Sequence, residues 1–360
     1  MRIAINAFFE RHPSTGTGQY TAQLLSALAA KGSPEDYLLL GGAAEGRGDH
    51  LSKIRLEQIV APRRAAEAGA AVLHYPYFAA PLASSVPVVA TVHDLIPVLL
   101  PAYRGSPLVR LYSALVCAGV RRARLVIADS ESTRRDVLRH LDISPARVRV
   151  IPLAASSRFS QAPGPAEREA VQRRYALPPR FALYVGGLDQ RKNVPRLIEA
   201  FALARQRRSL PHYLVIVGSR RPPSRLFPDP AEAARRAGVK NEVVFPGYVP
   251  DEDLPALYSL AEAFVYPSLY EGFGLPPLEA MACGTPVVCS EASSLPEVVG
   301  DAGLLVRPAD VEGLAEALGQ VLVDAKLREE LSWRGRRRAS QFSWERTARA
   351  TRQIYYEASR

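Results

Sequence analysis

The stretch that decides the fold runs from residue 266 to residue 284 and reads YPSLYEGFGLPPLEAMACG. It follows the short apolar run 263–266, turns through Gly272 and Gly274, and enters a helix pattern that Gly284 ends. Such a turn directs backbone N–H groups outward, and the helix N-terminus adds partial positive charge. The stretch therefore predicts a strand, a phosphate-binding turn and a helix in succession.

Two acids belong to this stretch, Glu271 in the turn and Glu279 inside the helix. A carboxylate accepts two hydrogen bonds from a vicinal diol, so one acid can bind sugar hydroxyls and the other ribose hydroxyls. Taken alone, Glu279 is better explained as a solvated helix residue and Glu271 as a turn acid. The combination of both acids with the glycine turn is what indicates a binding site.

A second strand, glycine turn and helix occur at residues 183–197, which read LYVGGLDQRKNVPRL. Gly187 lies in the turn, and Arg191 and Lys192 stand at the helix entry. Two cations and a helix N-terminus can neutralise a departing diphosphate without a metal ion. We therefore expect a metal-independent site here, the alternative being a solvated basic turn.

Short β-branched runs alternate with longer helix patterns through most of the chain, which is typical of parallel sheets covered by helices. The expected strands are 2–6, 37–40, 72–74, 88–92, 125–128, 148–151, 181–185, 213–217, 243–245, 263–266, 287–289 and 303–306. We predict an α/β protein with two Rossmann-like, doubly wound domains facing a central cleft. Because ligands bind beyond the carboxyl ends of such strands, the cleft is the expected site.

The predicted domain boundaries follow turn-forming residues. The first domain is expected at 1–165 and the second at 175–341, joined by the proline-rich segment 156–179. A final helix at 342–360, capped by Ser343, is expected to cross back to the first domain. The acidic run 251–253 is predicted to cap a helix rather than to bind metal.

Length and composition agree with this plan. A chain of 360 residues with 48% hydrophobic residues suits two domains. No apolar stretch approaches the roughly 20 residues of a membrane-spanning helix, and no signal-type segment follows Arg2, so a cytoplasmic location is expected. The cysteines Cys117, Cys283 and Cys289 suit neither a disulfide framework nor a zinc site, and we expect buried thiols.

The net charge of +10 is concentrated in the first half of the chain. The segment 106–124 combines an apolar run with several arginines, a pattern that could lie on the anionic inner face of a cell membrane. The alternative is a core helix whose arginine ends are solvated. No zinc-finger, RNA-recognition or basic-region motif is present, so nucleic acid is not an expected partner.

Two features of the first half are candidates for the site. Gly16 and Gly18 lie between the first strand and the first helix but lack the third glycine of a dinucleotide fingerprint, which argues against NAD. Flexible backbone there could approach phosphates or an acceptor. His93 ends the expected strand 88–92, where a side chain would meet the cleft.

On these residues the chain resembles the retaining glycosyltransferases of family 4, which have the GT-B architecture. The resemblance runs from Met1 to about Tyr356 and implies a hexosyltransferase without a cofactor. It implies that Glu271 and His93 contact the donor sugar and that Arg191 and Lys192 hold phosphate. Ribose would bind Glu279, and Gly16 and Gly18 would form the first loop. Further donor contacts would come from Phe273, Gly274 and Leu275 and, near the base, from Gly218, Tyr248 and Val249.

Within that family the chain looks most like bacterial mannosyltransferases that build O-antigen and other surface polysaccharides. This implies GDP-mannose as donor and a glycan or lipid-linked glycan as acceptor. The alternatives are a UDP-sugar donor such as UDP-glucose, a same-fold epimerase or phosphorylase, and a non-enzymatic nucleotide-binding module. One departure is the first loop, where Thr15, Thr17 and Gln19 replace the Gly-Gly-Ile-Gly-Arg-Tyr pattern of other members. Retention at the anomeric carbon is expected to proceed by front-face substitution.

Overall fold

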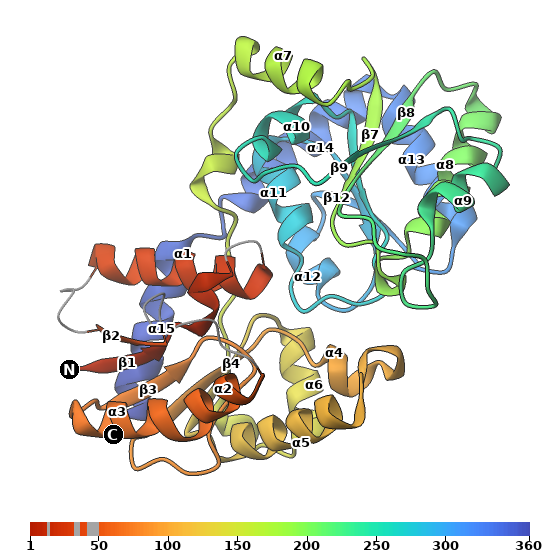
Figure 1. The fold of residues 1–360 in the computed structure, drawn as a ribbon. Helices are drawn as coiled ribbons and strands as arrows, with labels where there is room; N and C mark the ends of the chain where they lie inside the picture. Colours follow the sequence, from red (N-terminus) through yellow and green to blue (C-terminus); the bar gives the residue numbers. More distant parts are fainter. Residues whose placement is uncertain (13–14, 32–36, 42–49) are drawn as a thin grey trace. The chain divides into compact units, whose positions relative to one another are not determined.

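The computed structural model describes the chain except for residues 13–14, 32–36 and 42–49. It divides into two compact units, one formed by Met1–Leu153 with Ser343–Arg360 and the other by Ala154–Phe342. Each unit contains a six-stranded sheet, and every strand pair in it is parallel. The predicted pair of doubly wound α/β sheets is confirmed, and Figure 1 shows helices on the faces of both.

The sheet of the first unit has the strand order β2-β1-β3-β4-β5-β6. Its strands are β1 (Ile3–Asn6), β2 (Tyr37–Leu40), β3 (Val72–Tyr75), β4 (Val88–Val92), β5 (Leu125–Ala128) and β6 (Val148–Val150). The central strands β1, β3, β4 and β5 are buried along their whole length, as their apolar sequences require.

The helices of the first unit connect these strands. They are η1 (Phe8–Arg11), α1 (Gly16–Lys31), α2 (His50–Arg55), the π-helix η3 (Leu56–Val60), α3 (Ala61–Glu67), α4 (Ile96–Leu99), η4 (Pro101–Tyr103), α5 (Pro107–Arg122), α6 (Glu131–Leu141), η5 (Pro145–Arg147) and α15 (Trp344–Ala358). The last helix, α15, packs along α1 and reaches β4 (Figure 1).

A buried polar chain fixes α15 to the first sheet. Ser343 caps the helix by accepting a hydrogen bond from the Arg346 backbone N–H at 3.2 Å. Further along α15, the Tyr355 hydroxyl lies 2.7 Å from Nδ1 of His74, which belongs to β3. The other ring nitrogen of His74, Nε2, lies 2.9 Å from Thr91 Oγ1 of β4. Burial lowers the pKa of His74 to about 3, so this histidine stays neutral.

The sheet of the second unit has the order β12-β11-β10-β7-β8-β9. Its strands are β7 (Phe181–Val185), β8 (Tyr213–Val217), β9 (Val243–Gly247), β10 (Ala263–Tyr266), β11 (Val287–Ser290) and β12 (Gly303–Val306). Its helices are η6 (Ser157–Ser160), α7 (Pro165–Arg174), η7 (Gln190–Lys192), α8 (Val194–Arg208), α9 (Pro230–Arg236), α10 (Leu254–Leu260), α11 (Leu275–Cys283), α12 (Leu295–Val299), α13 (Val311–Val323) and α14 (Ala325–Ala339). Helices α8, α9 and α13 form one layer, and α10, α11 and α14 form the opposite one (Figure 1).

Three details differ from the sequence-based expectations. The segment 156–179 forms η6 and α7 within the second unit, with Gly164 at the N-cap position and Pro165 beginning α7, so the division falls near Ala154. Helix α1 begins at Gly16 and therefore includes both glycines of the expected loop. Asp253 precedes α10 without a capping bond, and its carboxylate instead accepts hydrogen bonds from Arg174 at 2.6 Å and from the Tyr175 hydroxyl at 2.6 Å.

Two further expectations concern the cysteines and membrane crossing. Cys117, Cys283 and Cys289 are free; Cys289 is buried and the other two are half-buried. Among the described residues, no helix has the length and apolar character needed to cross a membrane.

Candidate active site

The two glycine turns singled out in the sequence lie side by side. They follow β7 and β10, which are neighbours in the second sheet and are paired in register, Phe264 opposite Leu183. Hydrogen bonds join the turns directly, because the Leu269 N–H donates to the Arg191 carbonyl at 2.8 Å and Asn193 Nδ2 donates to the Pro267 carbonyl at 3.1 Å. The carboxyl edge of the sheet therefore brings both motifs into one site.

Three predicted site residues form a buried ion cluster at this edge. Glu271 Oε1 lies 2.8 Å from Arg191 Nη1 and 2.7 Å from Lys192 Nζ. The Lys192 ammonium also donates to the Tyr266 hydroxyl at 2.5 Å, and Arg191 Nη1 donates to the Tyr270 carbonyl at 2.8 Å. The ionic side chains are only 11–12% exposed, so water screens this cluster poorly.

The cluster keeps Glu271 ionised. Burial would raise the pKa of Glu271, but Lys192 and Arg191 overcome it and hold the pKa at about 2. Burial and the neighbouring Arg191 lower the pKa of Lys192, against the opposing attraction of Glu271. Asp189 is a second acid of this cluster, with its Oδ1 3.7 Å from Arg191 Nε. Two carboxylates therefore balance two cations, and an anionic ligand would compete with these acids for the same N–H donors.

The turn before α11 is held by two serines that the sequence argument did not identify. The Glu271 N–H donates to Ser293 Oγ at 2.7 Å, and Ser294 Oγ donates to the Glu271 carbonyl at 2.9 Å. Gly274 has φ 126°, and a Cβ there would lie 2.9 Å from Leu295 Cδ2. Phe273 and Gly274 of this turn are buried. Leu275 follows them and begins α11, so the turn sets the direction of the α11 N-terminus, which carries partial positive charge.

Glu279 lies in a different environment from Glu271. Its Oε2 accepts a hydrogen bond from the Tyr258 hydroxyl at 3.2 Å. Burial has the largest effect on the pKa of Glu279 and raises it, the Tyr258 hydrogen bond lowers it, and Asp251 raises it. The resulting pKa is about 7. The two glutamates of one motif are thus tuned in opposite directions, Glu271 to stay charged and Glu279 to titrate near neutrality.

Glycines allow the neighbouring turns to approach closely. A Cβ on Gly218 would lie 2.2 Å from the Gly186 carbonyl oxygen, so no side chain fits where the turn after β8 meets the turn after β7. A Cβ on Gly187 would lie 3.0 Å from Asp189 Oδ2. After β9, Tyr248 is 59% exposed and Val249 is buried. The Tyr248 ring is therefore accessible to a ligand at this edge of the sheet.

The remaining predicted residues belong to the first unit. His93 Nδ1 lies 2.7 Å from Asp129 Oδ2, and its Nε2 lies 3.2 Å from the Pro76 carbonyl. Burial lowers the pKa of His93, but Asp129 outweighs it and the net shift is upward. Asp129 was not predicted, although its position directly after β5 could have indicated it.

The glycines of the first unit lie in the first turn of α1. A Cβ on Gly18 would lie 2.0 Å from the His12 carbonyl oxygen, while Gly16 has open space around its Cα. Gly18 is therefore required by close packing, and its N–H donates to Thr15 Oγ1 at 3.1 Å.

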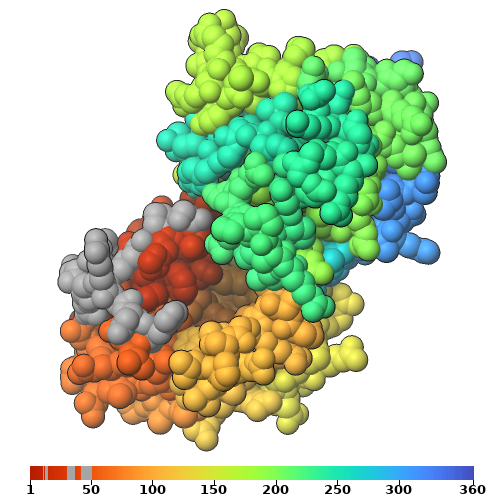
Figure 2. Space-filling model, turned by 45° about the vertical axis from the view of Figure 1, so that its right-hand side comes forward, coloured from red at the N-terminus to blue at the C-terminus, as the bar shows by residue number. Residues whose placement is uncertain are grey.

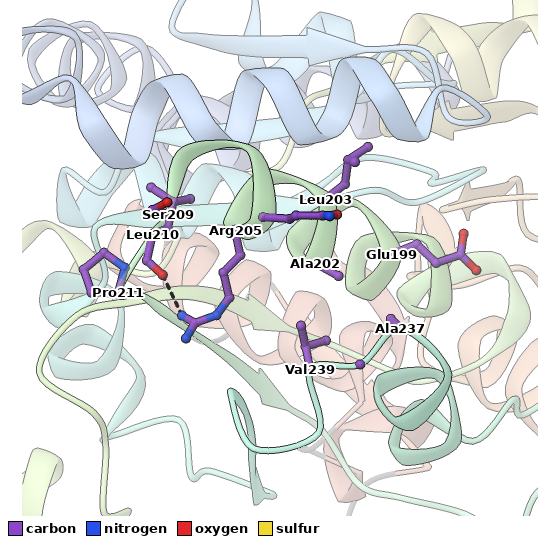
Figure 3. A pocket seen from close by; sticks show the side chains of 11 residues that line it. Glu199, Ala202, Leu203, Arg205, Ser209, Leu210, Pro211, Ala237 and Val239 are labelled. Carbon is purple, nitrogen blue, oxygen red and sulfur yellow. Dashed lines mark hydrogen bonds between the residues drawn. The ribbon is translucent and has the colours of Figure 1, made fainter.

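A hollow of about 860 Å³ lies elsewhere on the second unit (Figure 3). Its lining comes from the end of α8, the residues that lead into β8, and the end of α9. The hollow is at the amino end of β8, opposite the edge that holds Glu271, so it is separate from the candidate site. Among the described residues, no group of three or more His, Cys, Asp or Glu side chains could hold a metal ion.

Comparison with known proteins gives the class of the chain. The family model Glycosyltransferase Family 4 matches residues 14–156, and the model Glycosyl transferases group 1 matches residues 167–338. The chain is similar to sucrose-phosphate synthase from Thermosynechococcus elongatus, with a TM-score of 0.74 and 24% identity over 99% of this chain and 98% of that one. It is a glycosyltransferase with the GT-B fold.

Individual relatives within this class are mannosyltransferases. The chain is 35% identical to O-antigen chain mannosyltransferase B of Escherichia coli, over 96% of this chain and 97% of the relative. It is also 35% identical to an MMP alpha-(1->4)-mannosyltransferase of Mycolicibacterium hassiacum, over 76% of this chain and 66% of that protein. The chain therefore belongs to the glycosyltransferase family that carries these two domains and has mannosyltransferase homologues. Membership of this family implies a nucleotide-sugar donor and a glycan acceptor.

The pKa of Glu279 predicts how nucleotide binding depends on pH. If its carboxylate accepts hydrogen bonds from ribose, protonation below pH 7 removes that acceptor. The Kd for a nucleoside diphosphate should then be several-fold weaker at pH 6 than at pH 8, measured by titration calorimetry.

The matched control is Glu279→Gln, whose Kd should be weak at both pH values. Inorganic pyrophosphate, which lacks ribose, should bind the wild type and the variant alike. Because burial disfavours the charged carboxylate, the variant should melt no lower than the wild type at pH 8. An equal pH dependence of nucleotide binding in both proteins would contradict this role of Glu279.

Proposed function

We propose that this protein transfers mannose from GDP-mannose to a hydroxyl of a glycan or lipid-linked glycan, with retention and without a metal ion. The observation that carries the proposal is the buried cluster of Arg191, Lys192 and Glu271 at the carboxyl edge of the second sheet. The choice of mannose rests on the names of the relatives, both of which are mannosyltransferases.

In the proposed reaction, the bond between the anomeric carbon and the β-phosphate oxygen breaks and a bond to the acceptor oxygen forms on the same face. The acceptor hydroxyl gives its proton to an oxygen of the departing phosphate. The products are a glycoside and a nucleoside diphosphate whose added negative charge must be stabilised. Arg191 and Lys192 supply fixed positive charge for this purpose, which is why no metal is needed.

Glu271 is assigned to hydroxyls of the donor sugar rather than to nucleophilic attack. Its carboxylate is already bound by two cations, and a pKa near 2 makes it a weak nucleophile. Leaving-group assistance therefore replaces a covalent intermediate in this account. A glycosyl-enzyme adduct trapped on the protein and detected by mass spectrometry would contradict it.

The remaining donor contacts are assigned from where each residue lies in its unit. The backbone N–H groups of Phe273, Gly274 and Leu275 are assigned to the sugar and phosphates at the start of α11. The ribose is assigned to Glu279, and the base to the exposed ring of Tyr248. In the first unit, His93 is assigned to the donor sugar.

The donor base and the role of metal can be tested together. Thermal melts with GDP, UDP, ADP and NAD, each with and without EDTA, should show a rise with GDP that EDTA does not change, because a ligand that binds only the folded state stabilises it. A rise with UDP alone would identify a UDP-sugar donor instead. A rise lost in EDTA would contradict metal independence, and a rise with NAD alone would contradict the proposed function.

We further propose that the first unit contacts an anionic membrane surface. Large apolar side chains are exposed at the start of α5, where Leu108 is 78% and Leu111 is 69% exposed, and at the start of α2, where Leu51 is 75% exposed. The two helices lie together, because the Tyr112 hydroxyl of α5 donates to Glu57, which follows α2, at 2.9 Å. Figure 2 shows the atoms of α5, in gold, on the surface of the first unit.

The charges around these apolar residues fit the same partner. Arg55, Arg104 and Arg110 are exposed beside them. Residues 50–125 contain just three acids, Glu57, Glu67 and Asp94, and Glu57 is fully buried. A surface with inserted leucines and flanking arginines is attracted to anionic lipid and is weakened by salt. The rest of α5 is largely packed against the first unit, so its exposed first turns carry this contact.

Vesicle binding tests this contact. The wild type should sediment with phosphatidylcholine vesicles that contain phosphatidylglycerol, less so at high salt, and not with phosphatidylcholine alone. Leu108→Glu and Leu111→Glu should abolish binding, whereas Val323→Glu, at a half-exposed position of the second unit, should leave it unchanged. Equal binding by all of these variants would contradict the assignment.

A further inference from the structure

A row of four buried aromatic rings runs through the second unit from β7 to α10. It begins with Tyr184 on β7, continues with Tyr266 and Phe264 on β10, and ends with Tyr258 on α10. The distance between ring centroids is 5.9 Å from Tyr184 to Tyr266, 5.8 Å from Tyr266 to Phe264 and 5.3 Å from Phe264 to Tyr258. These residues are 0–1% exposed, so water does not reach the rings.

The two tyrosines at the ends of the row have their hydrogen-bond partners in the candidate site. The Tyr184 hydroxyl donates to the Gly187 carbonyl at 2.6 Å, in the turn after β7. The Tyr258 hydroxyl donates to Glu279 Oε2 at 3.2 Å, on α11. One end of the row therefore contacts the first glycine turn, and the other end contacts the acid that is assigned to ribose.

The third hydroxyl, that of Tyr266, lies within the row and contacts the ion cluster. It accepts a hydrogen bond from Lys192 Nζ at 2.5 Å, and it is also hydrogen-bonded to the Glu271 side chain. Burial raises the pKa of Tyr266 well above its usual value, so the hydroxyl keeps its proton. It can therefore donate to Glu271 while it accepts from Lys192.

Apolar packing does not explain the three hydroxyls. A buried hydroxyl destabilises a fold unless it has a partner, so a row that only filled the core would be served by phenylalanine, as at Phe264. The first glycine turn also packs directly on the row, because a Cβ on Gly186 would lie 3.0 Å from the Tyr184 hydroxyl and 3.6 Å from Tyr266 Cε2. Since each ring is held by its neighbours, the positions of the hydroxyls are fixed.

We propose that Tyr184, Tyr258 and Tyr266 are positioning residues of the donor site. Their packed rings hold three hydroxyls at fixed places, and these hydroxyls orient the first glycine turn, Glu279 and the ion cluster before a nucleotide binds. Because the tyrosines are buried, they act through these groups and do not contact the ligand. The inference rests on the proposed function, since it names the residues that orient the proposed phosphate and ribose contacts.

The substitution Tyr258→Phe tests the contact with Glu279. The Tyr258 hydrogen bond favours the charged carboxylate, so its loss should raise the pKa of Glu279. The fall in GDP affinity at acid pH should then occur about one pH unit higher than in the wild type, the size of one hydrogen bond. Inorganic pyrophosphate lacks ribose, so its Kd should not change. The other titratable neighbours of Glu279 remain, and they are Asp251, Arg158 and Cys283.

The substitution Tyr266→Phe tests the contact with the ion cluster. The Tyr266 hydroxyl accepts from the Lys192 ammonium, so its loss should lower the pKa of Lys192. Pyrophosphate and GDP should then lose affinity at a lower alkaline pH than in the wild type, while the acid midpoint for GDP should stay unchanged. The charged neighbours of Lys192 remain, and they are Glu271, Arg191 and Asp189.

Two further variants separate positioning from packing. Tyr184→Phe should weaken GDP and pyrophosphate alike and move neither midpoint, because its partner is a backbone carbonyl that does not titrate. The matched control is Tyr75→Phe in the first unit, where the buried Tyr75 hydroxyl donates to the Glu57 carbonyl at 2.6 Å. That variant should lose melting temperature through the same kind of lost hydrogen bond and bind both ligands like the wild type.

The Kd values are measured by titration calorimetry in acid, neutral and alkaline buffers, with UDP in place of GDP if thermal melts select UDP. Melting temperatures show that each variant folds. If the three variants only lose melting temperature, as Tyr75→Phe does, and both midpoints stay at their wild-type pH, the row is core packing and the inference is wrong. If the wild type binds neither nucleotide nor pyrophosphate, the proposed function fails and the inference fails with it, a result that is seen without any variant.

Discussion

The charge balance around Glu271 is the constraint on which the site depends. Two cations, Arg191 and Lys192, are held within 2.8 Å of one buried carboxylate oxygen. Removing one member of such a cluster is costly, roughly 3–5 kcal/mol for a broken buried pair, because the remaining charge is poorly solvated. A diphosphate can take over the same N–H donors, because phosphate oxygens accept strong hydrogen bonds from guanidinium and ammonium groups.

The fold explains how distant parts of the chain meet in this cluster. Arg191 and Glu271 are far apart in sequence, but β7 and β10 are neighbours in a parallel sheet, so the turns that leave them are neighbours too. Ser293 and Ser294, which follow β11 on the next strand, then fix the backbone of the Glu271 turn. A single edge of one sheet thus supplies the cations, the acid and the groups that position them.

Much of this arrangement could be predicted from the sequence. The strand patterns gave the correct strands because buried parallel strands are short β-branched runs, and the glycine turns marked where Arg191, Lys192, Glu271 and Glu279 would lie. Local patterns could not show that Glu271 pairs with both cations, because that contact depends on strand order. They also could not separate the two glutamates, whose opposite pKa shifts arise from neighbours such as Tyr258 on α10.

The misjudged details have a common cause. Asp253 and the start of the first helix were interpreted from local propensity, whereas tertiary contacts decide the role of Asp253 and the packing of Gly18. The Asp253 carboxylate accepts hydrogen bonds from Arg174, the last residue of α7, and from Tyr175, which follows it. Gly18 is packed against the His12 carbonyl. The proline-rich segment before α7 likewise reads as a linker in sequence but builds the start of a helix that packs on α10.

The most direct test of the account is the Kd of the stabilising nucleoside diphosphate for the wild type, Glu271→Gln and Arg191→Ala, measured by titration calorimetry. If the diphosphate competes with Glu271 for the cations, Glu271→Gln should bind it more tightly than the wild type, and Arg191→Ala should bind it at least tenfold more weakly. If Glu271→Gln instead loses affinity as Arg191→Ala does, the carboxylate organises the cations for the ligand and does not compete with it, and the central claim is contradicted.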